Sequence, residues 1–178
     1  VDQGQQYHSM DSSLKQLAIQ SSRYLSTWLQ WTLARPNSAF RDEVVVVDEV
    51  DDDDGKTVRK VPLMELPAIN PNGHKWLPKE NWLADFCKVE KQQGRKVLVY
   101  VRQTGTRDIQ DRVMMPLQAT GLRVSILSGN VDSRKREEWI AKRVNTIDVL
   151  ICNPRLVETG LDLVQFSTVV FFEIEYSL

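Results

Sequence analysis

A short polar segment follows an apolar run near the C-terminal end of the chain. Residues 147–152 (IDVLIC) are mostly apolar and predict a buried strand of a parallel sheet. The segment that follows contains Glu158, Thr159, Gly160 and Asp162. Ligands of open α/β sheets bind beyond the carboxyl ends of the strands, so this spacing would offer carboxylates and backbone amides to a ligand. The alternative interpretation is a glycine turn with a solvated aspartate.

Regularly alternating segments from residue 78 onward would position these groups. Apolar runs predict strands at 96–102, 123–127, 147–152 and 168–174, and helical periodicity predicts helices at 79–93, 106–120 and 132–143. The expected fold is therefore α/β, with right-handed βαβ units and a parallel sheet flanked by helices. Asn153-Pro154 ends one strand, because proline cannot donate to the ladder. Trp82, Leu83, Phe86 and Val89 are expected to face inward. Arg107 and Arg112 are expected to be helix-surface charges.

The first part of the chain has a different pattern. Apolar residues at helical spacing predict one long helix that begins at a cap near Asp11 and ends before Pro36, with Trp28 and Trp31 packed inside. Apolar runs at 43–50 and 57–66 predict a β-hairpin with an acidic, exposed turn at 51–54. A Pro/Asn/Gly-rich loop at 67–76 marks a boundary. We expect an accessory helix and hairpin at 1–75 and an α/β domain at 76–178.

The hairpin also imitates nucleotide-binding motifs. Gly55-Lys56-Thr57 looks like the end of a phosphate loop, and Asp48-Glu49 looks like a magnesium-binding acidic pair. A phosphate loop needs a second glycine where Val50 stands, and the acidic pair normally follows the loop rather than preceding it. We therefore interpret the segment as a hairpin turn and expect no metal site.

Composition and charge say less about function than the motifs do. The 178 residues carry a net charge of −1, without an apolar run long enough to span a membrane, so we expect a cytoplasmic protein with no membrane partner. Cys87 and Cys152 lie in apolar patterns and are expected to be buried thiols. His8 and His74 have no partner cluster and are not expected to act as catalytic bases.

Three blocks of the α/β region occur in a familiar order. They are 96–100 running into Gln103-Thr104-Gly105-Thr106, then Leu127-Ser128-Gly129 followed by Arg136, and finally 157–163 after the buried strand. With these blocks, residues 78–178 resemble the second RecA-like domain of superfamily 2 helicases and translocases, particularly the Swi2/Snf2-like branch.

The resemblance implies a site shared with another domain. It implies that ATP and Mg²⁺ bind in the full-length protein, against a first RecA-like domain, and that DNA, expected to be double-stranded, is the other partner. The chain ends before the expected arginine-finger motif, and no catalytic residue is expected within it. Pro154 stands where many members have a phosphate-contacting threonine, so Asn153 could substitute. The residues implied are Glu158, Gly160 and Asp162 for the nucleotide, and Thr104, Thr106, Asn153 and Thr159 for nucleic-acid phosphates.

A rival hypothesis stays open at this stage. A non-catalytic RecA-like or flavodoxin-like module that mediates protein contacts would show the same alternation of strands and helices. Glu158 likewise has two interpretations, a turn residue or a contact in the ATP cleft.

Overall fold

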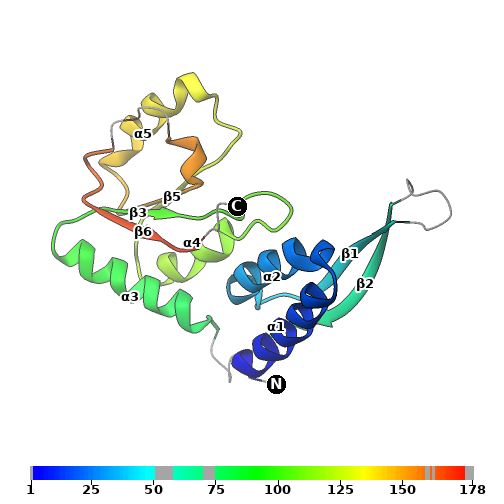
Figure 1. Ribbon diagram of the computed structural model, residues 1–178. Helices are drawn as coiled ribbons and strands as arrows, with labels where there is room; N and C mark the ends of the chain where they lie inside the picture. Colours follow the sequence, from blue (N-terminus) through cyan, green and yellow to red (C-terminus); the bar gives the residue numbers. More distant parts are fainter. Residues whose placement is uncertain (1, 51–57, 70–74, 159–160, 162, 175–178) are drawn as a thin grey trace. The chain divides into compact units, whose positions relative to one another are not determined.

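A computed structural model describes residues 2–50, 58–69, 75–158, 161 and 163–174. The chain forms two compact units, residues 1–75 and 76–178 (Figure 1). The predicted acidic turn at 51–54 lies outside the described residues.

The N-terminal unit packs two helices against a hairpin. Its elements are α1 (Gln3–Gln20), a 3₁₀ turn (Ser22–Tyr24), α2 (Leu25–Ser38), β1 (Glu43–Val50) and β2 (Val58–Leu66). The strands are antiparallel, as predicted, with a register shift between Val45 and Val46. The core of this unit consists of Met10, Leu14, Trp31, Val45 and Leu66.

The prediction of one long helix at 11–35 was wrong. Extended backbone at Ser21 separates α1 from α2, and Asp11 lies inside α1, where it accepts a hydrogen bond from Trp28 Nε1 at 2.7 Å. Pro36 lies within α2 rather than beyond its end. Proline has no N–H to bind the carbonyl four residues earlier. That carbonyl, on Thr32, instead accepts a hydrogen bond from the Tyr7 hydroxyl at 3.2 Å.

A buried arginine joins all parts of the N-terminal unit. Arg35 is 1% exposed and forms an ion pair with Glu43 Oε2 at 3.3 Å. Its Nε and Nη2 donate to Gln6 Oε1 at 3.0 and 2.8 Å. The remaining acceptors are the backbone carbonyls of Ser38, Arg41, Leu66 and Pro67. Burial lowers the pKa of Arg35, and Glu43 partly offsets that effect.

The C-terminal unit is a four-stranded parallel sheet covered by helices, which confirms the predicted RecA-like architecture. Its elements are α3 (Pro78–Gln92), β3 (Val97–Tyr100), α4 (Gln110–Ala119), β4 (Val124–Leu127), α5 (Arg136–Val144), β5 (Val149–Cys152) and β6 (Thr168–Phe171), with 3₁₀ turns at Ser133–Lys135 and Pro154–Leu156. The strand order is β4-β5-β3-β6. Helix α5 lies on one face of the sheet, and α3 and α4 lie on the other (Figure 1).

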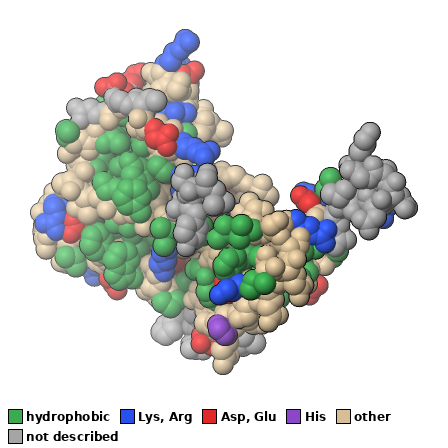
Figure 2. All heavy atoms as spheres, viewed as in Figure 1, with side chains coloured by type: hydrophobic (Ala, Val, Ile, Leu, Met, Phe, Trp, Pro, Cys, Tyr) green, Lys and Arg blue, Asp and Glu red, His purple; other side chains and the backbone are tan. Residues whose placement is uncertain are grey.

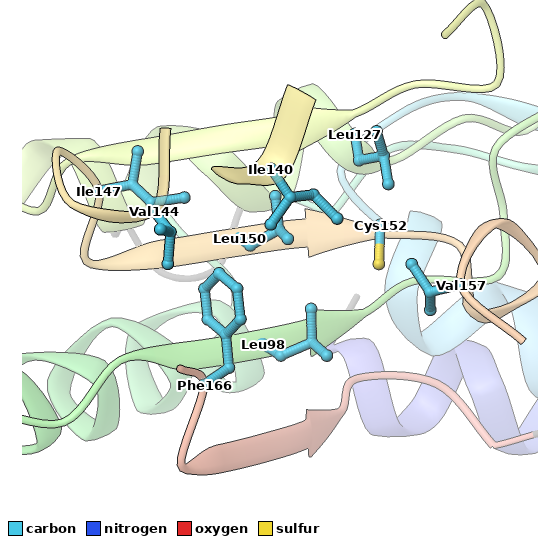
Figure 3. Close-up of a cluster of buried hydrophobic side chains, with 9 residues drawn as sticks. All are labelled: Leu98, Leu127, Ile140, Val144, Ile147, Leu150, Cys152, Val157 and Phe166. Atoms are coloured by element: carbon cyan, nitrogen blue, oxygen red, sulfur yellow. The ribbon is translucent and has the colours of Figure 1, made fainter. Parts of the chain in front are cut away.

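The core beneath α5 holds the sheet together. Ile140 and Val144 of α5 point towards Leu150 of β5 and Leu98 of β3 (Figure 3). Cys152 belongs to the same cluster, and both cysteines are buried free thiols, as predicted. Burial raises the pKa of each thiol to about 12, so neither is a thiolate nucleophile at neutral pH.

Helix α3 differs from its prediction in the residues it buries. Trp82 and Val89 are 55% and 47% exposed, not inward-facing. Glu80 is buried instead, where it accepts from the Leu77 backbone N–H and binds Arg112 at 2.7 Å. Arg112 was therefore wrongly predicted as a solvated charge. Figure 2 shows hydrophobic side chains gathered over α3 and the edge strand β6.

Two carboxylates fix the amino edge of the sheet. Asp148, just before β5, accepts from both the backbone and the side chain of Arg123 and forms an ion pair with Lys91 at 2.9 Å. Burial alone would raise the pKa of Asp148, but hydrogen bonds from Arg123 and Lys91 hold it well below its usual range. Glu90 is bound by Arg95 and the Thr168 hydroxyl, which lower its pKa to about 2.

Candidate functional site

A pocket lies at the carboxyl edge of the sheet, where β3, β4 and β5 end side by side. Its volume is about 480 Å³. Parallel strands place the loops that follow them at one edge, which is where open α/β sheets bind ligands. The pocket is lined by Thr104, Asp108, Gln110, Ser128, Gly129, Asn130, Asn153, Arg155 and Leu156.

Asn153 holds two of the loops around this pocket. Its Oδ1 accepts a hydrogen bond from the Arg155 N–H at 3.0 Å, which caps the 3₁₀ turn that begins with Pro154. Its Nδ2 donates to the Arg102 carbonyl at 3.1 Å and to Thr104 Oγ1 at 3.0 Å. A primary amide has two N–H donors, and both are used here. Asn153 therefore positions the loop after β3 rather than offering a donor to a ligand.

The hydrogen bond from Asn153 determines whether the Thr104 hydroxyl can donate to a ligand. A hydroxyl has one proton to donate besides its acceptor lone pairs. Because Oγ1 of Thr104 accepts from Asn153, its own proton remains available for donation. Thr104 lines the pocket, so this donor suits an oxygen-bearing ligand there.

A buried glutamate supports the same loop from the neighbouring strand. Glu173 follows β6 and is 7% exposed. Its Oε2 accepts from the backbone N–H groups of Arg102 at 2.5 Å and Gln103 at 2.9 Å. Glu173 lies within the apolar run predicted at 168–174, and its supporting role was not predicted.

Arg136 links the loops after β4 and β5. Its Nε donates to the Val131 carbonyl, and its Nη1 donates to the Leu156 carbonyl, both at 3.2 Å. Arg136 belongs to the second block of the sequence pattern, and the structure gives that block a positioning function at the pocket.

The structure separates the predicted site residues into three groups. Thr104 and Asn153 meet in the pocket, although they are far apart in sequence. Thr106 and Glu158 are exposed and are not among the residues that line it. The predicted Thr159, Gly160 and Asp162 lie outside the described residues.

Asp108 and Gln110 line the pocket but were not predicted. The helix expected from Thr106 begins at Gln110, because Asp108 Oδ1 accepts from the Gln110 N–H at 2.8 Å. An aspartate whose side chain binds the backbone N–H two residues on marks a turn, and this signal just before a helical pattern could have indicated the boundary.

The arrangement suits binding rather than covalent chemistry. The described residues that line the pocket supply hydroxyls, amides, one carboxylate and the exposed cation Arg155. Within the described ranges, no group of three or more His, Cys, Asp and Glu residues could hold a metal ion. Arg155 can form charge-assisted hydrogen bonds with the oxygens of an anionic ligand.

Comparison with known families places the pocket in context. A model of the helicase conserved C-terminal domain matches residues 78–178, more than half of the chain. The chain belongs to this family. The match covers α3 to β6, so the pocket lies entirely within the helicase C-terminal domain. No curated protein and no solved structure gives a significant match. Among the described helices, none has the length and apolar character needed to cross a bilayer.

Proposed function

We propose that this helicase C-terminal domain is the second motor domain of an ATP-dependent DNA helicase or translocase of the Swi2/Snf2-like branch. In this proposal the pocket at the carboxyl edge of β3, β4 and β5 holds a backbone phosphate of double-stranded DNA. The observation that carries the proposal is the Thr104 hydroxyl, which Asn153 leaves able to donate into the pocket. Contacts of this kind position a nucleic acid without reading its sequence.

The nucleotide side of the proposal rests on the segment after β5. Glu158, Gly160 and Asp162 would bind ATP, with Mg²⁺ and the phosphate loop contributed by a first RecA-like domain. Of these three residues only Glu158 is described, and it is exposed, which suits a contact from another domain. The buried thiols are consistent with a reducing cytoplasm as the working compartment.

DNA binding by the chain tests the phosphate contact. We expect fluorescence anisotropy at about 50 mM salt to show binding of a labelled duplex that weakens as salt rises. Thr104→Val preserves the shape and removes the hydroxyl. A hydrogen bond to a charged group contributes about 1.5–3 kcal/mol, so affinity should fall about tenfold or more.

Thr106→Val is the matched variant. The resemblance also implied a phosphate contact for Thr106, but Thr106 is exposed and does not line the pocket. It should bind DNA nearly as the wild type does. An equal loss in both variants would place the DNA outside the pocket, and no binding by the wild-type chain would reject the proposal.

Asp162→Ala in the full-length protein tests the nucleotide contact separately. Loss of one hydrogen bond to a ribose should raise the KM for ATP about tenfold. Melting of the isolated chain should change little. Unfolding of the chain together with an unchanged KM would make Asp162 a structural residue.

A further inference from the structure

Gln110 is a buried polar residue whose side chain lacks a complete set of partners. It is the first residue of α4 and is 6% exposed. Its Nε2 has no hydrogen-bond partner within the part of the chain that the structure describes. Gln110 also lines the pocket that contains Thr104. A buried amide donor without a partner is destabilising, so its position beside a pocket points to a ligand that completes it.

The surroundings of Gln110 define the kind of ligand atom. Its backbone N–H is already bound by Asp108 Oδ1 at 2.8 Å, so the side-chain amide is the donor that remains. The first turn of a helix carries a partial positive charge, which favours an anionic oxygen at this position. Thr104 supplies a second donor to the same pocket.

The charges that line the pocket also indicate which kind of phosphate fits it. Among the described residues that line the pocket, Asp108 is the one carboxylate and Arg155 the one cation. A terminal phosphate carries up to two negative charges and would need more cations to offset Asp108. An internal phosphodiester carries one charge and matches neutral donors.

We propose that Gln110 donates through Nε2 to a non-bridging oxygen of an internal DNA phosphodiester, on the same ligand that Thr104 contacts. The inference rests on the proposed DNA-binding function and adds a contact residue to it. Because Gln110 is neutral, its contact contributes affinity without a released counterion, unlike a contact from Arg155.

Gln110→Met tests the inference in the whole chain. Methionine has a similar length and no donor, so it fills the space without leaving a buried polar group unpaired. We expect duplex affinity to fall about tenfold, measured by anisotropy. The melting temperature should stay the same or rise, whereas loss of a structural hydrogen bond would lower it. The slope of log affinity against log salt should not change.

Gln118→Met is the matched control, because Gln118 is exposed on the same helix and does not line the pocket. It should change neither affinity nor melting. Gln110→Glu is a second variant of nearly identical shape, and its carboxylate should weaken binding more than methionine does.

The possible outcomes distinguish the Gln110 contact from the DNA-binding proposal on which it rests. Wild-type binding that Gln110→Met leaves unchanged would overturn the contact and leave the DNA-binding proposal standing. A fall in affinity accompanied by a fall in melting temperature would assign Gln110 a structural role and also overturn it. No duplex binding by the wild type would reject both.

Discussion

Replacing Arg35 by methionine should destabilise the N-terminal unit severely. Methionine keeps much of the aliphatic volume and removes every donor that reaches Gln6, Glu43 and the surrounding carbonyls. Removing one partner of a buried ion pair costs about 3–5 kcal/mol. A whole domain is stable by only about 5–15 kcal/mol, so this loss should leave residues 3–66 close to unfolding at room temperature.

Hydrogen exchange of the full chain, followed by mass spectrometry, measures the effect unit by unit. In Arg35→Met, the amides of α1, α2 and the hairpin should lose protection, while those of β3 and β5 keep theirs. Arg41→Met is the matched control, since Arg41 binds the same Glu43 carboxylate with 30% of its side chain exposed. The control should cost less than about 1 kcal/mol. If Arg35→Met costs no more than Arg41→Met, the buried network does not hold the unit together.

Two further predictions concern the C-terminal unit. Asn153→Ala should weaken duplex binding, because Thr104 loses the hydrogen bond that orients its hydroxyl. The amides of residues 102–106 should also exchange faster with solvent. Unchanged exchange at these amides would contradict the positioning role of Asn153. The pKa of Glu90 is about 2, lowered chiefly by Arg95, against an ordinary value of about 4.3. Its contribution to stability is present above that ordinary value and lost as the pH falls towards 2. Melting of Glu90→Gln should therefore depend less on pH than that of the wild type between about pH 5 and 2, and parallel curves would refute the pKa shift.

The parallel sheet could be predicted because its strands are short and apolar on both faces. Val97–Tyr100 and Val149–Cys152 are buried between helix layers, so their sequences are nearly free of polar residues. Gly94 and Gly121 follow α3 and α4 and have positive φ, and a glycine at such a position is a local sequence signal for a helix end. These signals are local, and tertiary contacts do not change them.

The features that were missed depend on partners distant in sequence. The apolar periodicity of residues 14–33 does not show the break at Ser21, since Leu14 of α1 and Trp31 of α2 belong to one core with the hairpin. Arg112 looks solvated until the fold places Glu80 beside it. The sequence cannot show that the Gln110 amide nitrogen lacks a hydrogen-bond partner, because this depends on which acceptors the fold places around it.

The strand order has a consequence for how the chain folds. Val97 of β3 pairs with Val149 of β5 and with Thr168 of β6, both far ahead of it in the chain. The central strand therefore gains no sheet partner until residues near 149 are available, whereas the β1–β2 hairpin closes locally. Long-range pairing slows folding, because the entropy cost of closing the loop comes before the stabilising contacts form. During synthesis the N-terminal unit should fold first, and the apolar segment at 97–101 should wait, exposed to chaperones and to aggregation, until β5 emerges.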